Sequence, residues 1–147
     1  MSVVDTTVKI AISQFEAEIE GKKSYLILFY AGFATYWAQC VEKTLENMLI
    51  AKELSEKSAL TNRLVEETFD KIENSKSTMG KLAFEVKKVF AINDEHTTLL
   101  KNVLERRNYF AHKFFKVNSF KPYTEKGQKA MILEYSRFID DCKKNRF

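Results

Sequence analysis

Glycine and proline, which form most tight turns in proteins, are scarce in this sequence. The chain has four glycines and one proline among its 147 residues. A sheet of many strands needs a turn after almost every strand, and these turns depend heavily on those two residues. Alanine, leucine, lysine and glutamate, which favour helices, are plentiful. We therefore predict an all-α fold.

Apolar residues recur at helical spacing in five long segments and one short segment. The long segments span about 3–19, 24–51, 55–74, 94–116 and 125–144, and the short one about 78–90. Ser77 or Thr78 is expected to cap the short helix, and Asn93 or Asp94 the helix that follows it. Residues 117–127 form the one long loop, around Pro122. We predict a single domain, residues 1–147, folded as an antiparallel bundle of four to five helices.

Several classes of protein are not indicated by the sequence. Cys40 and Cys142 lie far apart and outside any CxxC motif, so we predict free thiols rather than a disulfide framework or a zinc site. The first ten residues lack a basic region and contain Asp5, which is unlike a signal peptide. The most apolar run, 25–38, is shorter than the ~20 residues of a membrane-spanning helix, and is expected to be a central core helix. We expect a cytoplasmic protein without metal, cofactor or membrane partner.

Positive charge is concentrated in the last third of the chain. Residues 1–100 contain 12 Lys and Arg against 15 Asp and Glu, whereas residues 101–147 contain 12 against 5. Such asymmetry is found on surfaces that face polyanions. A solvated, lysine-rich helix exterior is the alternative interpretation.

The stretch LERRNYFAHKFF, residues 104–115, combines polar and apolar side chains in an unusual way. On a helical wheel, one side carries Leu104, Asn108, Ala111, His112 and Phe115, and the opposite side carries Val103, Phe110, Phe114 and Val117. A helix with two apolar sides can bury only one of them in its own core, so the side that bears Asn108 and His112 is expected to lie against something else or in a cleft. A second copy of the chain is the simplest cover for the other side, so we predict a homodimer.

The polar residues of this stretch suit the cleavage of RNA without a metal. His112 can move a proton to or from the attacking or leaving oxygen, because histidine titrates near neutral pH. Arg107 can stabilise charge on the phosphate, and Asn108, one turn before His112, can orient the imidazole or hold the substrate. Two copies related by a two-fold axis would make a more complete site than one.

The motif RNYFAH, residues 107–112, resembles the R-x4-H signature of the HEPN superfamily in its RNxxxH form. Together with STMGKL at residues 77–82, the wider stretch is similar to an uncharacterised bacterial branch of that superfamily. The resemblance covers about the last half of the chain. It implies a homodimeric, metal-independent ribonuclease with RNA as substrate and a 2′,3′-cyclic phosphate as product.

The resemblance also implies roles for particular residues and partners. Arg107 and His112 are expected to be catalytic, and Asn108, Arg106 and Lys113 to position the substrate. Arg106 also fits an R-x5-H spacing, so either guanidinium could face the cleft. Many members of the family are toxins controlled by an antitoxin or a nucleotidyltransferase-like partner. In one branch the partner modifies a tyrosine two residues after the histidine, where this chain has Phe114.

Structural interpretations of the same residues stay open. His112 fits a histidine buried in the core, and Arg107 fits an ion pair with Glu105 or with an acid from the first hundred residues. The aromatic residues Tyr109, Phe110, Phe114 and Phe115 fit packing as well as base stacking. The alternative function is a non-catalytic dimeric module that binds RNA, a nucleotide or a protein, and a third is a plain interaction protein.

Overall fold

The structure is a computed structural model that describes residues 6–75 and 77–145, and this part of the chain is helical, with no strand. The prediction of an all-α fold is therefore confirmed. In chain order the helices are α1 (Thr6–Ala17), α2 (Lys23–Ser55), α3 (Asn62–Glu73), α4 (Met79–Val89), α5 (Asp94–His112), α6 (Phe114–Val117), the 3-10 helix η1 (Lys121–Tyr123) and α7 (Glu125–Lys144). Val3 and Val4, where we expected the first helix to begin, lie outside the described residues.

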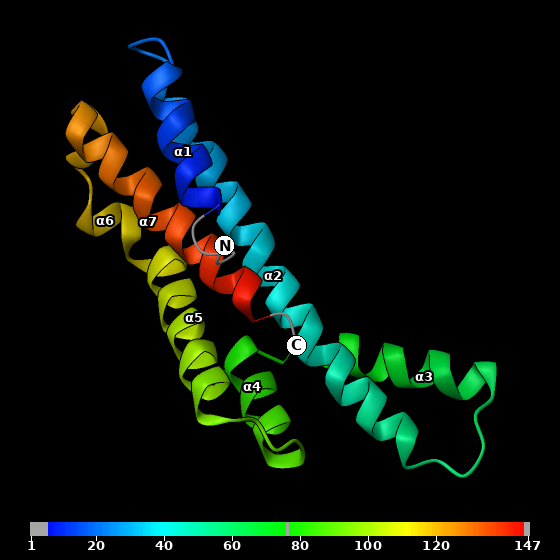
Figure 1. The fold of residues 1–147 in the computed structure, drawn as a ribbon. Coiled ribbons are helices and arrows are strands. Elements are labelled where there is room, and N and C mark those ends of the chain that lie inside the picture. The colour runs from blue at the N-terminus through cyan, green and yellow to red at the C-terminus, as the bar shows by residue number, and fades with distance from the viewer. Residues whose placement is uncertain (1–5, 76, 146–147) are drawn as a thin grey trace.

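The longest helix, α2, connects two groups of helices (Figure 1). Its first half packs against α1 and α7, and its second half packs against α3 and α4. On the side of α7 away from α1, α5 runs alongside α7. Buried side chains of α7, including Met131, Tyr135, Phe138 and Ile139, form the centre of the core.

A buried carboxylate fixes α1 to α7. Asp140 of α7 is almost fully buried and accepts hydrogen bonds from the backbone N–H groups of Thr7 (3.2 Å) and Val8 (3.3 Å). These amides lie in the first turn of α1, where no carbonyl of the helix itself can accept from them. The carboxylate therefore caps the helix and also complements its positive N-terminal dipole.

The apolar run 25–38 contributes to the core on one side only, so the expectation of a helix surrounded by the core is wrong for its other side. Ile27, Tyr30 and Ala34 are buried, but the opposite side of the helix is open. More than half of the surface of four large side chains on that side is exposed, namely Tyr25, Leu28, Phe29 and Tyr36. We call these four residues the α2 face.

The third helix begins later than predicted. Residues 56–61 are not helical, and α3 starts at Asn62. The Thr61 hydroxyl accepts a hydrogen bond from the Leu64 N–H (3.2 Å). A capping threonine at this position ends the preceding loop. Leu60, which fits the apolar stripe of the predicted helix, is consequently exposed.

The helix containing the RNYFAH motif ends at His112, four residues before the predicted end. Lys113 has φ −124° and ψ −28°, and the chain then forms the single turn α6. The change of direction inserts the Phe114 ring against Tyr135 (4.6 Å between ring centroids) and leaves it fully buried. Val117, expected on the core side, is 68% exposed because the break changes the side on which it emerges.

Candidate functional site

The outer side of α5 is open to solvent near its C-terminal end. Asn108, Ala111 and His112 are exposed, and Phe115 just beyond the helix is almost half exposed. The prediction that this second side is not covered by the chain's own core is confirmed for these residues. His112 is therefore not a buried core histidine, which removes one of the alternative interpretations.

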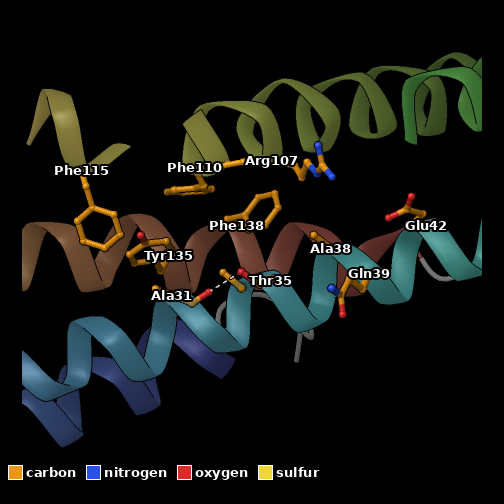
Figure 2. Close-up of a pocket in the computed structure, with 12 residues that line it drawn as sticks. Ala31, Thr35, Ala38, Gln39, Glu42, Arg107, Phe110, Phe115, Tyr135 and Phe138 are labelled. Atoms are coloured by element: carbon orange, nitrogen blue, oxygen red, sulfur yellow. Dashed lines mark hydrogen bonds between the residues drawn. The ribbon is translucent and has the colours of Figure 1, made fainter. Parts of the chain in front are cut away.

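A groove of about 240 Å³ lies beside this side, between α2, the α5–α6 segment and α7 (Figure 2). Most of its lining is alanine or aromatic, and the polar side chains of Thr35, Gln39, Glu42 and Arg107 complete it. The residues that line it are Ala31, Ala34, Thr35, Ala38, Gln39 and Glu42 of α2, Arg107, Phe110 and Ala111 of α5, Phe115 of α6, and Tyr135 and Phe138 of α7.

The two adjacent arginines point in different directions. The Arg106 guanidinium donates to the Asp141 carboxylate (2.5 Å) and to the Glu134 carbonyl oxygen (3.2 Å), so it joins α5 to α7. It also lies over the Phe138 ring, 5.5 Å from the centroid. Arg106 does not line the groove, whereas Arg107 does. The arginine that faces the groove is thus Arg107.

A hydrogen bond to the next residue holds the Arg107 side chain toward the open side of its own helix. Its guanidinium donates to Oδ1 of Asn108 over 3.1 Å. Glu42 stands on the opposite wall of the groove (Figure 2), and these two described residues form no ion pair with each other. The suggested pairing with Glu105 is not seen either, since that carboxylate lies 3.9 Å from Lys101. Arg107 therefore keeps donors that an incoming anion can use.

His112 and Lys113 lie at the end of α5, next to the groove rather than in it. Both are exposed, and His112 is the last residue of the helix. Asn108 is one turn before His112, so Arg107, Asn108 and His112 of the motif all lie at the same end of α5. The structure thus brings Arg107 and Asn108 into contact and leaves the imidazole accessible from solvent.

The groove also contains polar residues that were not expected from the motif, among them Tyr135 and Glu42. Tyr135 is buried, and burial raises the pKa of its phenol, which keeps the group protonated as a hydrogen-bond donor. Glu42 belongs to a helix that carried no recognisable motif. The signal available in the sequence was a stripe of small residues, Ala31, Ala34 and Ala38, that continues to Glu42 at helical spacing.

Most aromatic residues of the motif are packing residues. The Phe110 ring stacks on Tyr135 at 4.7 Å between centroids, and Phe114 is fully buried. The Tyr109 hydroxyl accepts a hydrogen bond from Asn118 (3.1 Å). The packing interpretation is confirmed for these three rings, and Phe115 is the exposed ring at the edge of the groove.

Residues 6–75 and 77–145 contain no cluster of three or more His, Cys, Asp or Glu residues placed to hold a metal ion. Within the same residues, no helix has both the length and the apolar content needed to cross a bilayer. Comparison with protein-family models gives no match to the sequence, and comparisons with curated proteins and with solved structures give none either.

Proposed function

We propose that this chain is a HEPN-like helical bundle that cleaves RNA without a metal, with Arg107 and His112 as its catalytic residues. One observation carries the proposal. Of the two neighbouring arginines, Arg106 is paired with Asp141, while Arg107 lines an open groove at the same end of α5 as the exposed His112. The motif residues that the chemistry needs are therefore the accessible ones, and the proposal gives Arg106 a structural role.

The reaction would be an attack of the ribose 2′-oxygen on the adjacent phosphorus. The 2′-hydroxyl loses its proton to a base, the new P–O bond forms a 2′,3′-cyclic phosphate, and the 5′-oxygen leaves after it takes up a proton from an acid. The Arg107 guanidinium would stabilise the extra negative charge on the phosphate in the transition state. Asn108 would hold that guanidinium in place through the hydrogen bond of 3.1 Å. Lys113 adds positive charge beside His112.

One protomer supplies too few imidazoles for this reaction. It needs both a base and an acid, and the second histidine of the chain, His96, lies at the other end of α5, about 24 Å away at 1.5 Å per helical residue. A second protomer would bring a second His112 and a second Arg107 to the same site. We therefore propose a homodimer with a composite site.

The α2 face supports this dimer. Tyr25, Leu28, Phe29 and Tyr36 each leave more than half of their surface in water, which amounts to roughly 100 Å² per side chain and about 400 Å² together. That is about half of the ~800 Å² per partner that stable interfaces bury. Leu28 stands two turns before Thr35 of the groove wall, so the face and the groove share an edge of α2. A second copy seated on the α2 face would also approach the open side of α5.

The experiment is cleavage of total RNA by the purified protein in the presence of EDTA. Wild type should produce fragments that end in a 2′,3′-cyclic phosphate, and His112→Ala and Arg107→Ala should each lower the rate at least about a hundredfold. Matched controls are His96→Ala on the same helix and Arg137→Ala on the exposed side of α7, which should cleave like wild type. Equal cleavage rates for wild type and His112→Ala would show that His112 is not a catalytic residue.

The second candidate is a non-catalytic dimeric module that binds RNA, a nucleotide or a protein. It is favoured by the position of His112, which lies beside the groove and not among the residues that line it. Under this proposal Arg107→Ala weakens binding of a ribonucleotide probe, while no new RNA ends appear with wild type. The appearance of cyclic phosphate ends that depend on His112 would exclude it.

An antitoxin or a nucleotidyltransferase-like partner stays a proposal as well. The position two residues after the histidine, where one HEPN branch carries a modifiable tyrosine, is occupied by Phe114, which has no hydroxyl and is fully buried. Control of this chain by such a partner would therefore have to use another residue or block the groove directly. Co-expression with a neighbouring gene product that restores growth would identify the partner.

A further inference from the structure

Two aromatic rings between α6 and α7 are more exposed than any other large apolar side chain in residues 6–75 and 77–145. Phe120 is 85% exposed and Tyr123 is 83% exposed. Both belong to residues 118–124, which contain η1 and connect the two helices. Single exposed apolar side chains are common on proteins. Two nearly bare rings on one short segment, however, are suited to contact with a ligand.

The backbone that carries these rings is firmly held. Asn118 is buried, and its side-chain amide donates to the Tyr109 hydroxyl (3.1 Å) and to the Phe114 carbonyl oxygen (2.8 Å). Gln128 of α7 donates to the carbonyl oxygen of Pro122 (2.7 Å). A backbone fixed in this way presents the rings without the entropy cost of ordering a loop on binding.

A glycine allows η1 to lie directly on α7. A Cβ atom added to Gly127 would be 2.2 Å from the carbonyl oxygen of Lys121, so only glycine fits at this contact. The Thr124 hydroxyl accepts from the Gly127 N–H (3.0 Å) and caps α7 at the same place. The exposed rings are thus fixed to the rest of the protein from both ends of the segment.

The surroundings of the rings are strongly basic. Residues 113–129 contain five lysines and one acid, Glu125, and that acid is paired with Lys23 of α2. Four of the lysines have no carboxylate partner within the described part of the chain: Lys113, Lys116, Lys121 and Lys126. Their charges are therefore available for phosphate groups.

We propose that residues 113–126 form a binding platform for single-stranded RNA. Unpaired bases stack on Phe120 and Tyr123, and the four lysines contact the phosphates between them. Duplexes cannot use the rings, because their bases are already stacked on each other. The platform would guide the strand toward the groove, since Phe115 belongs to the same segment and lines the groove with Arg107.

The composition of the platform favours RNA over a protein partner. Lysine is depleted at protein–protein interfaces, whereas lysines interspersed with exposed aromatic rings are typical of surfaces that bind single strands. The choice of RNA over another polyanion rests on the proposed function, because only the neighbouring Arg107 and His112 point to a ribose phosphate. The stacking and the charge do not depend on it.

The test uses the full chain with His112→Ala, so that no cleavage disturbs the binding measurement. Fluorescence anisotropy with a labelled twelve-nucleotide oligouridylate should show binding that a duplex of the same length does not match. Replacing Phe120 and Tyr123 by alanine should weaken binding of the single strand at least about tenfold. Exchanging the two ring types, Phe120→Tyr with Tyr123→Phe, should preserve binding, because both rings stack. A matched control is Phe84→Ala on α4, an exposed ring outside the platform.

Salt dependence tests the role of the lysines separately. Lys121→Gln with Lys126→Gln should reduce the slope of log affinity against log salt concentration by about 0.7 for each phosphate that the protein no longer neutralises. The proposal would be overturned if the lysine variant kept the wild-type slope and the double alanine variant of Phe120 and Tyr123 kept the wild-type affinity.

Other partners are separate outcomes of the same variants. If vesicles containing phosphatidylserine bind the chain through the two rings while RNA binding does not need them, the surface is a membrane contact and the proposal is wrong. It is equally wrong if the ring variant changes the oligomeric mass and leaves RNA binding untouched. Ring-dependent RNA binding without cleavage by wild type would support the platform and refute the proposed function. Cleavage that depends on His112 but not on the two rings would support the proposed function and refute the platform.

Discussion

The guanidinium of Arg106 lies 2.5 Å from the carboxylate of Asp141, and this contact fastens α5 to α7. Both side chains are about two-thirds buried, and the same guanidinium also covers the Phe138 ring. The pair holds the helix that presents Arg107 in its place beside the groove. It explains how two arginines that are adjacent in sequence come to have different surroundings.

Arg106→Ala is expected to lower the free energy of unfolding by about 1–2 kcal/mol, because it removes a charge-assisted hydrogen bond together with ring contact. Urea denaturation followed by circular dichroism measures this change. The control is Lys101→Ala, which removes an exposed pair with Glu105 at 3.9 Å and should cost less than about 0.5 kcal/mol. Equal decreases in the two variants would contradict a clamping role for Arg106.

Gly127 and Gly32 should respond to alanine with opposite signs. Gly32→Ala places a methyl group in open space on a long helix, and should stabilise the protein by about 0.5–1 kcal/mol. Gly127→Ala drives a methyl group into the Lys121 backbone, and the cost of moving that backbone should exceed the helix gain. Thermal melts at low protein concentration compare them, and a higher melting temperature for both variants would contradict the close packing of η1 on α7.

Cys142 should make the protein sensitive to alkaline pH. Burial raises the pKa of this thiol to about 12, against 9.0 for an ordinary cysteine. The unfolded chain therefore ionises at a lower pH than the folded one. The stabilisation is complete below pH 9 and is lost as pH rises toward 12, by at most about 1.4 kcal/mol per pH unit.

Urea denaturation at pH 8, 9 and 10 measures this decline. Cys142→Ala should flatten the fall in unfolding free energy above pH 9, and Cys40→Ala, at a partly exposed thiol, should leave it as in wild type. Burial also raises the pKa of Tyr30, whose ordinary value is 10.0, so the comparison is cleanest below pH 10. Identical slopes in the two cysteine variants would show that another group dominates.

The α2 face should be required for self-association. Phe29→Glu places a charge on that face and should convert a dimer to a monomer, because an unpaired carboxylate is costly to bury. Light scattering coupled to size-exclusion chromatography gives the mass. Phe84→Glu is a matched control, since Phe84 is exposed to nearly the same extent but lies on α4. Cleavage should fall with the mass in Phe29→Glu, and a wild-type monomer would contradict the composite site.

The helices could be predicted where local signals set them. Thr78 and Asn93 accept hydrogen bonds from backbone N–H groups three residues later, and α4 and α5 begin after them as the capping pattern indicated. Their side chains act within one turn, so no distant residue is involved. The start of α3 was predicted too early because the apolar stripe extends through Leu60, whereas the cap is Thr61.

Features that depend on distant residues could not be predicted. No glycine or proline near Lys113 indicates that the helix breaks there. The break follows from the packing of Phe114 against Tyr135, which is 21 positions later. The same holds for the two arginines. Their sequence positions are nearly equivalent, and it is Asp141, on another helix, that selects Arg106 and leaves Arg107 to the groove.

The placement of α3 bears on how the protein opens. This helix packs mainly on the second half of α2 and is joined to it by two surface ion pairs, Lys71 with Glu53 and Glu73 with Lys43. It lies away from the other helices in Figure 1. Its departure would therefore expose little of the interior built around α7. Amide protons of α3 should therefore exchange with deuterated water well before those of α7. The helix would unfold and refold as a separate cooperative unit while the groove stays intact.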